Sequence, residues 1–225
     1  MKRLIRISLL ALLPLICCAQ SQIGDRNFGS SSVPGPVLVS YTAADLVGGS
    51  TSFSITSTGA SHLVVVIVDN YSAATSVTVG SQAATKYSTC SGSGAHLLCL
   101  WYVASSTGGQ TSVTLNSGGD FYAASEYEFS GTNLTSPMDT VGTCTGISEV
   151  CTALVTPSTS HDGVIAAFSG SGCTEISETI TGSPSAILNQ SCADGLLVGE
   201  ATLTSSGTET AIESTTYYGA IWAFN

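Results

Sequence analysis

The sequence predicts an all-β protein, a two-sheet antiparallel β-sandwich of jelly-roll type. Two observations support this fold class. Short apolar or alternating runs follow one another from Val37 onward, and none shows the sustained 3.6-residue period of an amphipathic helix. Turn residues separate these runs, for example at Gly48-Gly49 and Gly108-Gly109. About 190 residues suffice for one all-β domain, so we expect a single domain over 37–225.

Each strand is expected where an apolar or β-branched run lies between two turn signals. The expected strands are 37–41, 52–56, 63–69, 76–79, 97–104, 112–115, 122–129, 153–156, 163–168, 186–188, 196–203, 210–214 and 218–224.

Residues 1–19 predict a secretory signal peptide. Three basic residues precede an apolar run over 7–16, and the small residues Cys17 and Ala19 mark a cleavage site after Ala19. The run is about half the length of a spanning helix. A lipid anchor at Cys17 or Cys18 is the alternative, less favoured because a bulky residue would precede it. Residues 20–36 form a polar leader, and the mature chain is expected to be secreted or held at the cell envelope.

The net charge of the mature chain argues against two classes of partner, nucleic acids and anionic membrane surfaces. Three of the five basic residues lie in the signal peptide, which leaves Arg26 and Lys86 against fifteen acidic residues and a net charge near −13. Such a chain repels nucleic acid and anionic membrane surfaces. Serine and threonine exceed a quarter of the sequence, so we expect a surface rich in hydroxyl groups, and no membrane span in the mature chain.

Six cysteines remain after the signal peptide, and an even number in an exported chain predicts disulfides. Fifteen pairings are conceivable, and sequence proximity favours Cys90–Cys99, Cys144–Cys151 and Cys173–Cys192. The spacings contain no C-x₂-C pair and no histidine at ligand distance, so we predict no metal site and no cofactor.

A weak internal repeat suggests that the chain has two similar halves. Ser61-His62 recurs ninety-nine residues later as Ser160-His161, and Leu97-Leu98 recurs as Leu196-Leu197. The same offset relates Gly108 and Thr111 to Gly207 and Thr210, and a four-residue deletion then relates Tyr122 and Phe129 to Tyr217 and Phe224. Duplication and similar strand demands both remain open as the cause.

Several short motifs resemble a diffuse group of secreted bacterial β-sandwich domains. They are Leu63-Val64-Val65-Val66, the ASEYEFSG segment over 124–131, Ser136-Pro137-Met138-Asp139 and the GAIWAFN ending over 219–225. The resemblance covers most of 37–225. It implies a surface or extracellular β-sandwich without an established activity, and it includes none of the cysteines.

Serine hydrolase chemistry finds little support in the sequence. No G-x-S-x-G elbow is present, and Ser160, His161 and Asp162 are neighbours that would point to alternating faces of a strand. We therefore interpret His62, His96 and His161 as edge or loop residues.

Glu126 and Glu128 are the one candidate catalytic pair. They lie two apart on an expected strand, on the same face at about 7 Å, which suits the carboxylate spacing of a glycosidase. The alternative is an exposed strand face whose charges prevent edge pairing.

Ligand-binding aromatic residues are expected at two strand starts. Phe121-Tyr122 and Tyr217-Tyr218 each place one ring outward, where it can stack on a sugar, whereas Trp101 and Trp222 lie in apolar runs and are expected in the core. Calcium would need loop carboxylates such as Asp69 and Asp120, but no calcium-loop motif is present. Lys86 is expected at the surface.

These observations predict a secreted, non-catalytic binding or surface-interaction module, with extracellular polysaccharide or cell-surface glycan as the leading ligand class. The alternatives are a glycoside-active enzyme using Glu126 and Glu128, and a structural or adhesive envelope protein with no small ligand.

Overall fold

The computed structural model describes most of the chain from Gly35 to Asn225. The described ranges are 35–46, 50–71, 73–93, 96–116, 121–145, 151–158, 162–169, 177–178, 188–193, 196–202, 208–213 and 218–225. The predicted signal peptide and nearly all of the leader lie outside them.

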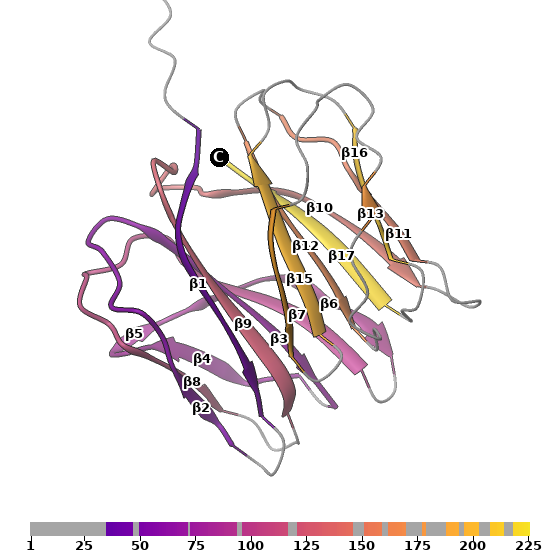
Figure 1. The fold of residues 1–225 in the computed structure, drawn as a ribbon. Helices are drawn as coiled ribbons and strands as arrows, with labels where there is room; N and C mark the ends of the chain where they lie inside the picture. Colours follow the sequence, from indigo (N-terminus) through magenta and orange to yellow (C-terminus); the bar gives the residue numbers. More distant parts are fainter. Residues whose placement is uncertain are drawn as a thin grey trace, which may run out of the picture. The chain divides into compact units, whose positions relative to one another are not determined.

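The described residues form antiparallel sheets and no helix, which confirms the all-β class (Figure 1). The first central sheet has the order β1 (Val37–Asp45), β9 (Phe121–Ser130), β3 (Leu63–Asn70), β7 (His96–Val103), β6 (Thr85–Ser93). The first outer sheet has the order β2 (Ser52–Ser54), β8 (Ser112–Asn116), β4 (Ser76–Val79), β5 (Gln82–Ala83).

The later residues form two further sheets. The second central sheet has the order β10 (Met138–Thr145), β17 (Tyr218–Phe224), β12 (Gly163–Ser169), β15 (Leu196–Thr202), β14 (Leu188–Ala193). The second outer sheet has the order β11 (Cys151–Val155), β16 (Glu209–Glu213), β13 (Ser177–Glu178). The described residues form four sheets where the sequence predicted two, so a two-sheet jelly roll is not confirmed.

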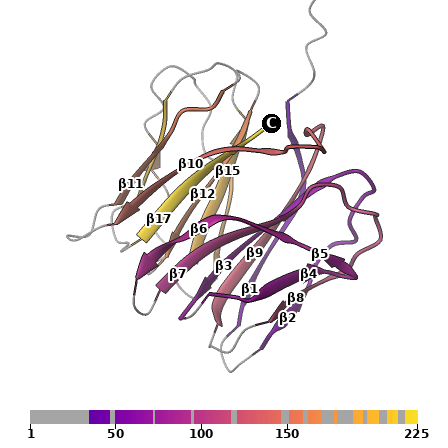
Figure 2. The same ribbon diagram turned by 180° about the vertical axis from the view of Figure 1, so that it is seen from behind.

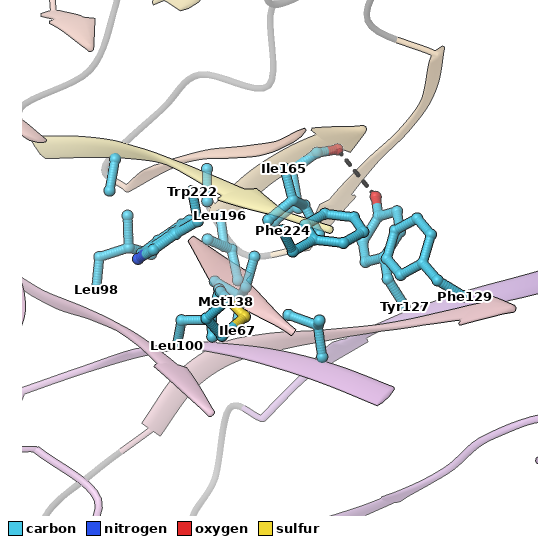
Figure 3. Packing of buried hydrophobic residues seen from close by; sticks show 14 of the residues in the cluster. Ile67, Leu98, Leu100, Tyr127, Phe129, Met138, Ile165, Leu196, Trp222 and Phe224 are labelled. Carbon is cyan, nitrogen blue, oxygen red and sulfur yellow. Dashed lines mark hydrogen bonds between the residues drawn. The ribbon is translucent and has the colours of Figure 1, made fainter. Parts of the chain in front are cut away.

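Three hydrophobic clusters of described residues explain why the central strands are apolar on both faces. The largest lies between the two central sheets and joins Tyr127 and Phe129 of β9 to Trp222 and Phe224 of β17 (Figure 3). Each central sheet packs its other face against its own outer sheet. All eight residues of β3 are consequently buried, as the unbroken run LVVVIVDN indicates.

The two halves share one strand order. Strands β1, β9, β3, β7 and β6 occupy the same positions in the first central sheet as β10, β17, β12, β15 and β14 in the second. The outer-sheet order β2-β8-β4 likewise corresponds to β11-β16-β13. Figures 1 and 2 show β2, β8 and β4 of the first outer sheet from opposite sides. The weak sequence repeat therefore coincides with a repeat of topology.

Register shifts mark the edges of both central sheets. They lie between Leu38 and Ser40 in β1, Tyr87 and Ser91 in β6, Met138 and Val141 in β10, and Leu188 and Ser191 in β14. Such bulges disrupt the regular row of free N–H and C=O groups, which discourages pairing with another chain.

Every expected strand overlaps an observed one, and 76–79 and 218–224 agree at both ends. The sequence missed β5, β6, β10 and β13. Each lies at the edge of its sheet and has few apolar residues, because an edge strand contributes less to the core than a central one.

Among the residues that the structure describes, there is no helix of the length and hydrophobicity that a membrane span requires.

Candidate functional site

The acidic pair of β9 lies inside the protein. Glu126 pairs with Thr42 of β1 and Val66 of β3, and Glu128 pairs with Ser40 and Val64. Glu126 is 0% exposed and Glu128 is 1% exposed. The interpretation of an exposed strand face that prevents edge pairing is therefore wrong. Strand β9 lies between β1 and β3, and Glu126 and Glu128 share the face of Ala124, which packs in the cluster with the first outer sheet.

Glu128 accepts hydrogen bonds on both carboxyl oxygens. Ser40 Oγ donates to Oε2 at 3.0 Å, and the Gly59 backbone N–H donates to Oε1 at 2.6 Å. His62 Nδ1 lies 2.8 Å from the same Oε1 and donates to it when Glu128 is ionised, because a carboxylate can only accept. These contacts give both buried carboxyl oxygens a partner and attach the segment 55–62 to the sheet.

Glycine at position 59 makes this arrangement sterically feasible. A β-carbon there would lie 2.4 Å from the His62 ring, well inside any real contact distance. The ring can therefore lie against the backbone while the Gly59 N–H reaches Glu128.

Glu126 has a different environment. Neither of its carboxyl oxygens has a hydrogen-bond partner among the described residues. Burial, and secondly the charge of Glu128, raise the pKa of Glu126 to about 8. Glu126 is thus mainly protonated at neutral pH, and a substrate has no direct path to either carboxyl group of the pair.

A second polar cluster joins the two central sheets. Ser169 Oγ of β12 donates to Asp69 Oδ2 of β3 at 2.6 Å and lies 3.0 Å from His96 Nδ1 of β7. His96 Nδ1 also lies 3.1 Å from Asp69 Oδ2. Asp69 and Ser169 are fully buried.

This Ser-His-Asp cluster does not have the geometry of a catalytic triad. In a triad the carboxylate and the nucleophile contact opposite nitrogens of the imidazole, whereas Asp69 and Ser169 here both contact Nδ1 of His96. The cluster instead crosslinks residues that are one hundred positions apart. Sequence reasoning missed it, and the one available signal was an aspartate at the end of an apolar strand.

The predicted aromatic residues are only partly described. Phe121 and Tyr122 lie on β9, but their side chains are outside the described part, as is Tyr217. Tyr218 begins β17 and is half-buried. Trp101 and Trp222 are buried, as predicted.

Two tyrosines that the sequence analysis did not select are exposed. Tyr71, directly after β3, is 58% exposed, and Tyr41 of β1 is 42% exposed. Tyr41 stacks on the buried Tyr127, with ring centroids 5.5 Å apart, so its ring is held against the sheet while the residue stays partly exposed. Val37 and Val39 are exposed on the same strand.

The first of the three predicted disulfides, Cys90–Cys99, is confirmed. Cys90 of β6 and Cys99 of β7 form a disulfide across neighbouring strands. Cys144 is also disulfide-bonded. The side chains of Cys151, Cys173 and Cys192 lie outside the described part, so the pairs Cys144–Cys151 and Cys173–Cys192 stay predictions.

Removing the first disulfide should lower the free energy of unfolding. Its partners are nine positions apart, and chain-entropy arguments assign about 2.7 kcal/mol to a loop of this size. We expect the double variant Cys90→Ala/Cys99→Ala to lose about this amount in urea unfolding. Reduction of the wild type would also break the disulfide of Cys144, so Cys90→Ser/Cys99→Ser is the second test. A loss below about 1 kcal/mol in both double variants would contradict the expectation.

Lys86 is exposed, as expected, and its Nζ lies 6.0 Å from the centre of the Trp101 ring.

The described residues contain no group of three or more His, Cys, Asp or Glu side chains that could hold a metal ion.

No family model, curated protein or solved structure matches this chain. The resemblance to secreted bacterial β-sandwich domains stays a prediction that rests on the short motifs quoted above.

Proposed function

We propose that this protein is a secreted, non-catalytic binding or surface-interaction module, with extracellular glycan as its ligand class. The observation that carries the proposal is the burial of Glu126 and Glu128. Glycoside hydrolysis requires two carboxyl groups that flank a bound sugar. Here one carboxyl has three hydrogen-bond partners and the other faces an apolar sheet interface, so we infer that the best enzymatic candidate serves the fold instead.

Exposed aromatic rings support a binding role. The flat faces of Tyr71 and Tyr41 are the kind of surface on which a sugar ring stacks, and Tyr41 is held in place by Tyr127. Rigid aromatic side chains supply contact area at low entropic cost. The net charge near −13 favours a neutral ligand over nucleic acid or another polyanion.

A tandem arrangement of jelly rolls is the fold we propose for this module. In each half the first strand pairs with the last, the last also pairs with the third, and the second strand begins a separate outer sheet. A double-sheet jelly roll has this kind of alternation between two sheets. The matching strand orders of the halves support duplication as the origin of the sequence repeat.

Retention on insoluble polysaccharides tests the proposed function. We expect the mature protein to be retained by at least one member of a broad glycan panel, and Tyr71→Ala or Tyr41→Ala to reduce retention at least tenfold. Tyr122→Ala and Tyr218→Ala test the aromatic residues that the sequence selected. Tyr71→Phe is the matched control, because it keeps the ring.

Two outcomes would overturn this proposal. Release of reducing ends by the wild type, lost in Glu126→Gln, would identify an enzyme. Absence of both retention and release across the panel would leave the structural or adhesive envelope protein as the better description.

A further inference from the structure

One buried interface contains a carboxyl group that the proposed function does not use. Glu126 projects from β9 of the first central sheet toward the first outer sheet, where the surrounding side chains form an apolar cluster. Val66 is its neighbour on β3, and Trp101 follows on β7 in the same cross-strand row. Trp101 Nε1 is buried there as well, without a hydrogen-bond partner among the described residues.

Glu126 and Glu128 differ in the partners that they have. Ser40 and Gly59 donate to Glu128, and His62 Nδ1 lies within hydrogen-bond distance of it, so both of its carboxyl oxygens have partners. Glu126 lies two residues away on the same face and receives none of these donors. An ionised carboxyl at this position would be a buried charge without compensation, the most costly state for a polar group in an interior.

Few other titratable groups face this interface. Glu128 and its partner His62 lie on the side of the segment 55–62, and Lys86 lies on β6 at the far end of the row, beyond Trp101. The facing residues of β1 and β3 carry no ionisable group. The strands of the first outer sheet, with sequences SFS, SVTV, QA and SVTLN, contain none at all.

We propose that Glu126 is a proton-controlled latch: its neutral carboxyl permits the first outer sheet to pack on the first central sheet, and its ionisation loosens this contact. The segment 55–62 joins β2 to β3 and hydrogen-bonds to 106–111, so the outer sheet has a covalent and hydrogen-bonded attachment on that side. Loosening therefore occurs by hinged opening of the outer sheet, while the core between the two central sheets stays closed.

The size of the effect follows from the proton affinities of the two states. The pKa of Glu126 is about 8 when the interface is closed and 4.5 when the carboxyl is in water. By proton linkage, the equilibrium constant for opening should rise roughly 50-fold between pH 6 and pH 8.

Hydrogen exchange of backbone amides measures this opening directly. We expect the protection factors of β4 and β8 to fall roughly 50-fold between pH 6 and pH 8 in the wild type. Those of β12 and β15, in the second central sheet, should stay unchanged. Protection factors are compared because they remove the intrinsic pH dependence of amide exchange.

Two variants identify Glu126 as the titrating group. Glu126→Gln keeps the shape without the acid, and Glu126→Met replaces it with an apolar chain of similar volume in case the amide is poorly tolerated. Both should show protection of β4 and β8 that does not change with pH. Equal wild-type protection at the two pH values, or the same pH dependence in both variants, would overturn the proposal.

Discussion

Replacing Glu128 with alanine should destabilise the protein by about 3 kcal/mol or more, measured as the loss in the free energy of unfolding in urea. The substitution removes the acceptor of Ser40 Oγ, the Gly59 N–H and His62 Nδ1 together. A buried donor that loses its partner costs about 1–3 kcal/mol, and breaking a buried charged pair costs about 3–5 kcal/mol.

Glu128→Gln is the matched control for this prediction. Its amide oxygen can still accept from one side, so we expect a smaller loss than in Glu128→Ala. A result within about 0.5 kcal/mol of wild type for Glu128→Ala, the range of an ordinary surface substitution, would show that this network does not hold the segment 55–62.

The second large effect is expected in the core between the central sheets. Phe129 of β9 and Phe224 of β17 contact each other across this core, with ring centroids 4.6 Å apart (Figure 3). Both are at most 1% exposed, and replacing a buried phenylalanine with alanine costs about 3–5 kcal/mol. We expect a loss of this size from each single variant in denaturant unfolding.

A double-mutant cycle tests whether the two rings act as one unit. The variant with both alanines should lose less than the two single losses added together, since each removed ring had the other as a neighbour. Tyr71→Ala is the surface control and should change stability by less than about 0.5 kcal/mol. Strict additivity of the two losses would contradict a direct contact between the halves.

A hydrogen bond supports the same contact between halves. Tyr127 stacks beside Phe129 and donates its hydroxyl to the backbone carbonyl of Val198, on β15 of the second central sheet, at 3.1 Å (Figure 3). A tyrosine in this core thus has a partner for its polar end.

Local patterns in the sequence predicted most of the strands. The runs LVVVIV of β3 and GVIAAF of β12 are apolar at every position, which favours strands buried on both faces. Edge strands such as β6 escaped detection because Thr85–Ser93 is mostly polar and its register shifts near Ser91. The four sheets of the described residues were not predicted, because no local pattern indicates how many sheets the strands will form.

The candidate site was harder to predict than the fold. Glu126 and Glu128 were identified as a pair, but strand alternation gives only their common face and not what covers it. Their burial depends on the first outer sheet and on Gly59 and His62, which are more than sixty residues away in sequence. The contact of Ser169 with Asp69 and His96 is equally non-local. Whether the carboxylate and the nucleophile contact opposite nitrogens of the imidazole, as a triad requires, depends on geometry that a local sequence pattern does not contain.

The buried, protonated state of Glu126 has a defined consequence for stability. Its pKa is raised in the folded chain relative to the unfolded one, so the folded state binds the proton more tightly. The stability that this group contributes is fully present below pH 4.5 and is lost as the pH rises to about 8.

Direct titration of the Glu126 carboxyl by ¹³C NMR tests the central claim that this group is interior and not part of an accessible acidic pair. The protein is labelled at the glutamate side-chain carbonyl carbons, and Glu126→Gln assigns the signal. We predict a titration midpoint at about pH 8. A midpoint near 4.5, the ordinary value for a glutamate in water, would contradict the account and return Glu126 and Glu128 to the surface as a candidate catalytic pair.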